Sequence, residues 1–237
     1  MNKLAPRMAT ERTPGCVLRP VVALDIDGTL GDWHSDFLEF AHNWLFGRRN
    51  PGRKGWFDYT GGALDYHMAV TKQEYRAVKL AYRQSGLKRD MPVFPGAQTL
   101  VNTVRAAGAE VWVCTTRPYL RLDNIDPDTR EWLDRNRIHV DGVVYGEHKY
   151  RDLCELVGIE RIVGALDDLP EMVRQAQTQG ISAMLIQRHH NQEWWAEWDK
   201  QEMMNRTYLP SLPHLPAAQE WFLAEIKDWK VKNDVRW

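Results

Sequence analysis

The sequence predicts an α/β fold built on a doubly wound parallel sheet. Four short apolar runs alternate with segments of helical periodicity, which is typical of strands buried on both faces of a sheet. Acidic or hydroxyl-bearing residues directly follow three of these runs. The chain has 237 residues, 43% of them hydrophobic and 27% charged, so one domain with an insert can bury a substantial core.

The expected strands are the apolar runs themselves, which cover residues 21–24, 111–114, 162–166 and 183–186. The segments between them have apolar residues at i, i+4 and i+7, or begin at proline and end at glycine, as helices do. These segments predict helices at 99–107, 150–157 and 170–179.

Two stretches interrupt this alternation. Residues 33–91 have aromatic and aliphatic residues at helical spacing, which predicts a helical insert after the first strand. Residues 191–237 are rich in tryptophan and end in a helical pattern through Phe222, Ile226 and Trp229, which we expect to pack as core in a C-terminal helical extension. The expected organisation is therefore a tail at 1–19, a core at 20–32 and 92–190, the insert at 33–91 and the extension at 191–237.

Composition excludes several classes of protein. Lys and Arg total 31 against 32 Asp and Glu, a formal net charge of −1, so a strongly basic nucleic-acid coat is excluded. No apolar run reaches the roughly 18 residues that span a membrane. The three scattered cysteines fit a reducing compartment, and the tail lacks the apolar stretch of a signal peptide, so we expect a cytoplasmic protein.

Polar side chains follow three of the expected strands. The carboxyl ends of parallel strands meet at one edge of a sheet, so these side chains are expected to share one crevice. Two carboxylates two residues apart can play different roles, one attacking phosphorus and the other moving a proton. Four clustered carboxylates repel one another unless a hard cation such as Mg²⁺ and fixed positive side chains are present. The residues expected to converge are Asp25, Asp27, Thr115, Arg117, Asp167 and Asp168.

The string from Asp25 to Leu30 matches the first motif, DxDG followed by T or V, of the haloacid dehalogenase-like phosphatases. The later motifs of that superfamily are also matched in order. The apolar strand that ends at Thr115 resembles the second motif, Lys149 the third, and Asp167 with Asp168 the paired acids of the fourth. The resemblance covers about residues 20–190 and implies a Rossmann-like core. The insert at 33–91 directly follows the first motif, which is the cap position of that superfamily, so the resemblance implies that it is a small helical cap.

The resemblance also implies roles for these residues. Asp25 would be the nucleophile that forms an aspartyl-phosphate and also binds Mg²⁺, and Asp27 the general acid and base whose backbone carbonyl reaches the metal. Either Asp167 or Asp168 would complete the metal site. The residues that would hold the phosphate are Thr115, Thr116, Arg117 and Lys149, with Arg130 competing with Lys149 for its position.

A narrower resemblance concerns the substrate. The stretch from Asp25 to Trp33 and the segment from Val93 to Ala97 look like those of the 5′(3′)-deoxyribonucleotidases. In that family the aromatic residue at the end of the first stretch lines the nucleobase pocket, which would make Trp33 part of the substrate pocket. The implied substrate is a small phosphomonoester, a nucleotide, with no membrane partner.

Two alternatives stay open. The 3′-phosphatase domain of polynucleotide kinase is also similar, at residues 115–117, 130–132, Lys149 and 165–168, which would make the partner a nucleic-acid 3′ end. A non-catalytic phospho-aspartyl regulatory module is the alternative outside enzymes. The long insert after the acidic strand argues against it, and so does Asp27, which would have no leaving group to protonate.

Overall fold

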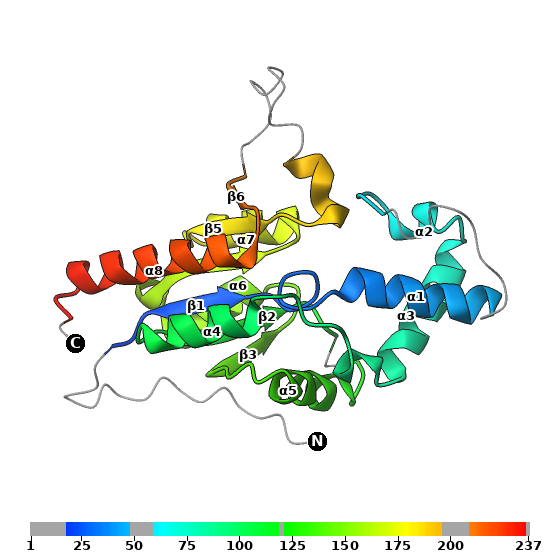
Figure 1. The fold of residues 1–237 in the computed structure, drawn as a ribbon, viewed down its shortest axis with the longest axis horizontal. Coiled ribbons are helices and arrows are strands. Elements are labelled where there is room, and N and C mark those ends of the chain that lie inside the picture. Colours follow the sequence, from blue (N-terminus) through cyan, green and yellow to red (C-terminus); the bar gives the residue numbers. More distant parts are fainter. Residues whose placement is uncertain (1–17, 48–58, 119–120, 196–208, 236–237) are drawn as a thin grey trace, which may run out of the picture.

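A six-stranded sheet forms the centre of the molecule in the computed structural model, which describes residues 18–47, 59–118, 121–195 and 209–235 (Figure 1). The strand order is β3-β2-β1-β4-β5-β6, and every pairing between these strands is parallel. The strands are β1 Val21–Leu24, β2 Glu110–Thr115, β3 Gly142–Tyr145, β4 Ile162–Asp167, β5 Ala183–Ile186 and β6 Ser211–Leu212. The predicted doubly wound parallel fold is confirmed.

Helices cover both faces of this sheet. One apolar cluster joins the sheet to α4 and α8, and another joins its opposite face to α6 and α7. The α-helices are α1 Trp33–Phe46, α2 Leu64–His67, α3 Lys72–Gln84, α4 Ala97–Ala106, α5 Ile125–Arg135, α6 Lys149–Val157, α7 Pro170–Thr178 and α8 Leu215–Lys232. Short 3₁₀ helices lie at η1 Leu87–Arg89, η2 Ile159–Arg161 and η3 His189–Trp194.

The four apolar runs form β1, β2, β4 and β5 because strands in the middle of the sheet must be apolar on both faces. The sequence interpretation missed β3 and β6. β3 is an edge strand with one buried residue among its four, and β6 is a two-residue strand between prolines, so neither forms a continuous apolar run. Helix α5, for which the sequence interpretation gave no range, starts at Ile125, and the buried side chain of Asp128 in its first turn accepts a hydrogen bond from Asn124.

The insert after β1 forms a separate helical body. Helices α1 and α3 pack against each other around an apolar cluster of their own, which includes Phe37, Val78 and Tyr82. Helix α1 begins where the Asp32 side chain accepts a hydrogen bond from the backbone N–H of Ser35. Figure 1 shows this body beyond the end of the sheet, on the side of the carboxyl ends of the strands.

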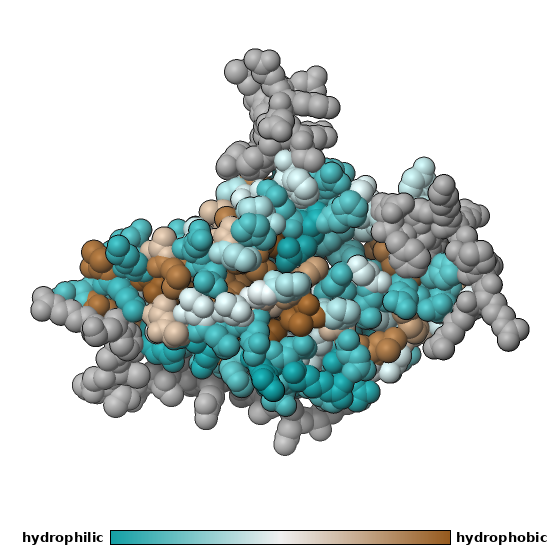
Figure 2. All heavy atoms as spheres, in the orientation of Figure 1, coloured by the Kyte–Doolittle hydropathy of each residue, from teal (hydrophilic) through white to brown (hydrophobic). Residues whose placement is uncertain are grey.

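The C-terminal region is part of the core rather than an appendage. β6 extends the sheet beside β5, and α8 packs on α4 and β4 with Phe222, Ile226 and Trp229 buried, as the helical pattern predicted. Figure 2 shows apolar side chains along the α8 end of an otherwise mostly hydrophilic face, where Val231 is 76% exposed. Residues 1–17 of the tail predicted at 1–19 lie outside the described residues, as does Trp198 of the tryptophan-rich segment.

No helix in the described parts of the chain is long and apolar enough to cross a membrane.

The strand order places a crevice between β1 and β4. The chain winds outward from β1 through β2 to β3 and then returns to the other side of β1, so the connections leave these two central strands in opposite directions. Ligands bind at such a switch point, outside the carboxyl ends of the strands. Leu24 is in register with Val113 and Leu166, so Asp25, Thr115 and Asp167 follow at nearly the same height.

Candidate active site

The turn after β1 is shaped by a glycine. Gly28 has φ +91°, a conformation that side chains rarely adopt, and a Cβ there would lie 2.0 Å from Oδ2 of Asp168. Glycine at this position therefore lets the β1 turn approach the acidic pair that follows β4.

A buried lysine joins two of the carboxylates. Lys149, the first residue of α6, is fully buried, and its Nζ lies 2.7 Å from Asp25 Oδ1 and 2.6 Å from Asp167 Oδ2. The hydroxyl of Tyr150 also donates to Asp167, at 2.7 Å. Burial raises the pKa of Asp25 well above its usual range, although Lys149 opposes this shift. The lysine thus stabilises an aspartate that burial alone would favour in its protonated form.

Two cations hold the second carboxylate of the motif. The Arg117 Nε lies 3.1 Å from both carboxylate oxygens of Asp27, and the Lys88 Nζ contacts its Oδ2 at 2.5 Å. Burial raises the pKa of Asp27, but the two cations outweigh burial and hold it well below its usual range. Burial also lowers the pKa of Lys88 to about 7. Asp27 is therefore an ion-paired carboxylate in this structure.

Arg117 is held from its other side by Thr129 of α5, whose hydroxyl accepts a hydrogen bond from Nη1 at 2.9 Å. Thr115 is buried, and its Oγ1 accepts from the backbone N–H of Arg117 at 3.4 Å. Thr116 and Arg117 both line a pocket at this crevice, which is described below. The end of β2 therefore supplies the hydroxyl of Thr115 and the guanidinium of Arg117 on one side of the crevice.

The carboxylates fit a divalent cation. Asp25, Asp167 and Asp168 each have an oxygen within 4.8 Å of the others, and all three are buried. They carry three formal negative charges against one positive charge on Lys149, and a single divalent ion balances the difference of two. Oxygen-only ligands favour Mg²⁺. Asp168 lines the pocket whereas Asp167 is turned toward Lys149 and Tyr150, so the geometry favours Asp168 as the direct ligand.

A pocket of about 270 Å³ lies between the core and the insert. Its core side is lined by Asp25, Asp27, Thr116, Arg117 and Asp168, and its other side by residues of the insert that include Trp33, Lys79 and Lys88. Thr115, Lys149 and Asp167 lie behind this lining and are buried. Trp33 stacks on Phe37 at 4.9 Å between ring centroids, and the Lys79 Nζ lies 5.3 Å from the centre of the Trp33 ring. Burial lowers the pKa of Lys79 to about 8. A hollow of about 480 Å³ along α8 is larger, but none of the candidate site residues lines it.

Arg130 does not reach the pocket. It lies on α5 with 65% of its side chain exposed, and its Nε pairs with Asp126 one helical turn earlier. Between the two residues that the sequence offers for the third motif, only Lys149 contacts Asp25.

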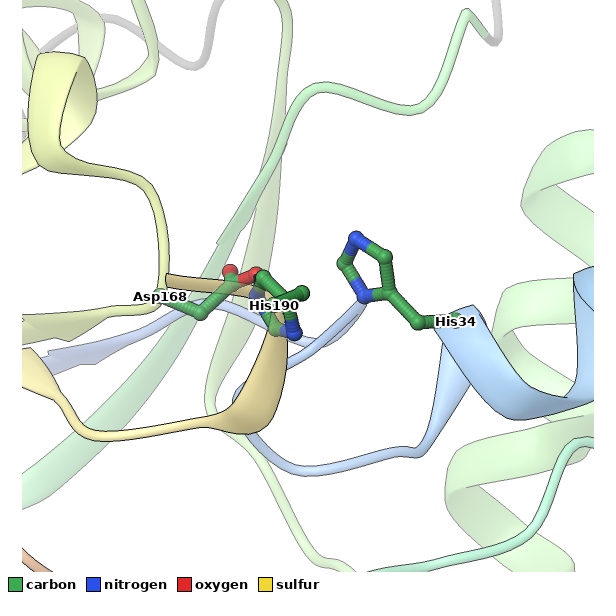
Figure 3. Close-up of side chains that lie close together, drawn as sticks. All are labelled: His34, Asp168 and His190. Carbon is green, nitrogen blue, oxygen red and sulfur yellow. Dashed lines mark hydrogen bonds and ion pairs between the residues drawn. The ribbon is translucent and has the colours of Figure 1, made fainter. Parts of the chain in front are cut away.

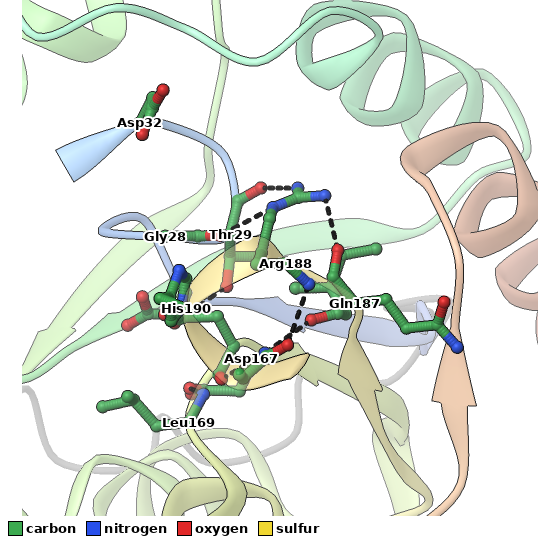
Figure 4. A network of polar contacts seen from close by, with 12 residues as sticks. Gly28, Thr29, Asp32, Asp167, Leu169, Gln187, Arg188 and His190 are labelled. Carbon is green, nitrogen blue, oxygen red and sulfur yellow. Dashed lines mark hydrogen bonds and ion pairs between the residues drawn. The ribbon is translucent and has the colours of Figure 1, made fainter. Parts of the chain in front are cut away.

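Several residues at the crevice were missed by sequence reasoning. Lys88 and His34 come from the insert, and no local pattern marks them. Arg188, which follows β5, donates from Nε to the carbonyl of Gly28 and from Nη2 to the carbonyl of Thr29, at 2.9 and 2.7 Å (Figure 4). Its guanidinium also lies 4.0 Å from the ring centre of Phe94, so it fixes the turn that carries the acidic motif.

The chain is similar to one family model, described as "5' nucleotidase, deoxy (Pyrimidine), cytosolic type C protein", which matches residues 19–208. No curated protein matches the chain.

Solved structures with similar folds include a haloacid dehalogenase-like hydrolase family protein from Streptococcus pneumoniae (TM-score 0.58, 15% identity, covering 86% of this chain and 98% of that chain). A predicted phosphatase from Clostridium acetobutylicum gives a TM-score of 0.59 at 16% identity and covers 88% of this chain and 100% of that chain. A HAD family hydrolase from Deinococcus radiodurans R1, with bound phosphate and sodium, gives a TM-score of 0.60 at 13% identity and covers 89% of this chain and 97% of that chain. At these identities the likeness concerns the fold alone.

Proposed function

Since this chain belongs to the 5' nucleotidase, deoxy (Pyrimidine), cytosolic type C family and is a haloacid dehalogenase-like phosphatase, we propose that it hydrolyses nucleoside monophosphates in the cytoplasm through an aspartyl-phosphate on Asp25. The main support for this proposal is that Asp25, which pairs with Lys149, lines the same pocket as the aromatic side chain of Trp33.

In the proposed reaction the carboxylate of Asp25 attacks phosphorus and the alcohol oxygen of the nucleoside leaves. Lys149 keeps Asp25 ionised for this attack and, with Thr115, holds the phosphoryl oxygens. Mg²⁺ held by Asp25, Asp168 and the backbone carbonyl of Asp27 would neutralise the charge of the phosphate. Water then hydrolyses the acyl-phosphate and regenerates Asp25.

The proton steps require Asp27 to leave its present ion pairs. A carboxylate bound by Arg117 and Lys88 carries no proton to donate at neutral pH, because the two cations stabilise its charged form and lower its pKa. We propose that a dianionic phosphate draws both cations toward its own oxygens when it binds. The pKa of Asp27 then rises, so Asp27 can protonate the leaving oxygen and later accept a proton from the attacking water.

Replacing Asp27 by asparagine is expected to lower kcat by roughly 10²–10⁴-fold with a nucleotide, because the leaving alkoxide receives no proton. In the first half-reaction the loss should be much smaller with p-nitrophenyl phosphate, whose leaving group needs no protonation. The pre-steady-state rate of leaving-group release, measured with both substrates at saturating Mg²⁺, isolates this step from the later hydrolysis of the acyl-phosphate, which needs Asp27 with either substrate. An equal loss in this first step would contradict the role of Asp27 as a general acid.

We also propose that the insert, residues 33–91, is the cap that closes over the substrate and that Trp33 stacks on the base. Replacing Trp33 by alanine is expected to raise KM for a nucleotide by about tenfold, because base–aromatic stacking contributes about 1–3 kcal/mol. KM for p-nitrophenyl phosphate should change less. The matched control is Trp44→Ala, at an exposed position of the same helix. Equal increases for both substrates would remove Trp33 from the base pocket.

The experiment that tests the function is phosphate release, with Mg²⁺ and with EDTA, from two kinds of substrate. One is a panel of 5′- and 3′-mononucleotides, and the other is an oligonucleotide with a 3′-phosphate. Mg²⁺-dependent release from mononucleotides supports the proposal. Release only from the oligonucleotide would replace it with a 3′-end phosphatase, and release from neither would overturn the choice of a nucleotide as substrate.

A further inference from the structure

A second group of metal-binding side chains lies beside the carboxylate cluster. We propose that His34, Asp168 and His190 form a second binding site, which shares Asp168 with the carboxylate cluster, for a nitrogen-preferring divalent cation such as Zn²⁺. Each of the three side chains offers one ligand atom, and these atoms all lie within 4.8 Å of one another. Figure 3 shows His34 projecting from the start of α1 toward His190 and Asp168, which come from the sheet side of the crevice.

The side chains are already close together and shielded from solvent. Nε2 of His190 lies 2.6 Å from Oδ2 of Asp168, and the two side chains are 8% and 1% exposed. The imidazole of His34 stacks on that of His190, with ring centroids 3.6 Å apart. Three residues from distant parts of the sequence therefore meet at one point.

His34 has a ligand atom that no other group in the described part of the chain uses. Its Nδ1 is buried and has no hydrogen-bond partner among the residues that the structure describes. A buried polar atom without a partner costs free energy, and such atoms are rare in folded proteins. A bound cation would use this nitrogen as a ligand and remove the cost.

The donor set selects the class of ion. Two imidazoles and one carboxylate are ligands of Zn²⁺ and other borderline transition metals, whereas Mg²⁺ prefers oxygen ligands. His34 and Asp168 also line the pocket, so a cation bound there would face the pocket with its remaining coordination position.

Neighbouring groups hold the ligands in place. The Nδ2 of Asn191 donates to the backbone carbonyls of Asp168 and Ile186, at 2.8 and 2.9 Å, which fixes the loop that carries His190. Thr29 Oγ1 donates to Asp168 Oδ1 at 3.4 Å. Such outer contacts orient metal ligands and raise the affinity of metal sites. Because His34 belongs to α1 and the other two ligands to the core, the ion would tie the insert to the sheet.

The test is cation binding to the whole chain after its metals have been removed. Calorimetry measures the binding of Zn²⁺, and visible absorption reports the ligands of bound Co²⁺. We expect one Zn²⁺ to bind at this site, and the Co²⁺ spectrum to show nitrogen ligation. His34→Gln and His190→Gln should each weaken Zn²⁺ binding at least about tenfold while Mg²⁺ affinity stays within about twofold. The matched control, His189→Gln, changes the exposed neighbouring histidine and should bind Zn²⁺ like the wild type.

Three results would overturn the site. These are no Zn²⁺ binding to the wild type, a Co²⁺ spectrum typical of oxygen ligands alone, and equal Zn²⁺ affinity in the wild type and both histidine variants. The wild-type Co²⁺ spectrum decides the matter even if a variant fails to fold, and thermal melting checks the folding of each variant. Binding is measured without substrate, so the outcome does not depend on the proposed nucleotidase activity.

Discussion

Asp25→Asn is expected to reduce phosphate release by about 10⁴–10⁶-fold, the loss typical of removing a catalytic nucleophile. The amide of asparagine is nearly the same shape as the carboxylate but does not attack phosphorus. The measurement is single-turnover and steady-state phosphate release at saturating Mg²⁺. Asp123→Asn, at an exposed position outside the pocket, is the matched control and should keep wild-type turnover. Substantial turnover by Asp25→Asn would contradict the assignment of the nucleophile.

The same variant should stay folded, and its stability tests the electrostatics of the site. Burial raises the pKa of Asp25, and Asp167 and Asp168 raise it further, so the charged form is disfavoured in the metal-free protein. Without metal we expect the Tm of Asp25→Asn to equal or exceed that of the wild type. Adding Mg²⁺ should raise the Tm of the wild type more than that of the variant. A Tm well below the wild type in EDTA would contradict this account.

Lys149→Met is expected to lower the free energy of unfolding by about 3–5 kcal/mol, the usual cost of removing one partner of a buried ion pair. Methionine keeps the length and apolar stem of the lysine, but it leaves Asp25 and Asp167 without their shared cation. Turnover should fall to background for the same reason. Urea unfolding at pH 7 measures the loss of stability, and Lys72→Met, at an exposed position of α3, should change it by at most about 0.5 kcal/mol.

The loss in Lys149→Met should depend on pH in a defined direction. Burial already raises the folded-state pKa values of Asp25 and Asp167 above their ordinary range. Without the lysine they rise further, so the folded variant binds protons more tightly than the unfolded chain, and its stability increases as the pH falls. The deficit relative to the wild type should therefore shrink between pH 8 and pH 5. The double variant Asp25→Asn/Lys149→Met should lose less free energy of unfolding than Lys149→Met alone. A loss that changes neither with pH nor with the removal of the Asp25 charge would indicate a packing defect instead.

The part of the site on the sheet could be predicted because it follows from topology. Asp25, Thr115 and Asp167 end three parallel strands, and parallel strands end at one edge, so their convergence needed only the strand assignments. The choice between Lys149 and Arg130 could not be made in this way. Both belong to helices that follow strands, and only the packing of α6 against β2 and β3 places the lysine under the carboxylates.

The residues from the insert could not be predicted for a related reason. Lys88 lies 61 positions after Asp27, and the contact between them depends on how α1, α3 and η1 stack. Helical periodicity indicates which face of each helix is apolar, but it does not fix where a cation at a helix end will point. His190 is a similar case, since adjacent histidines in a loop give no sign of which one turns inward.

The insert and the sheet each have an apolar cluster of their own, which affects how the substrate preference of this enzyme can change during evolution. Phe37 and Tyr82 stabilise the insert by contacts within the insert, whereas β1 and α4 are stabilised by contacts within the core. Substitutions in one body thus leave most of the packing of the other unchanged. New pocket walls can arise by changes in the helical insert while the acidic motif and its lysine keep their geometry, so substrate preference and reaction chemistry are free to evolve at different rates.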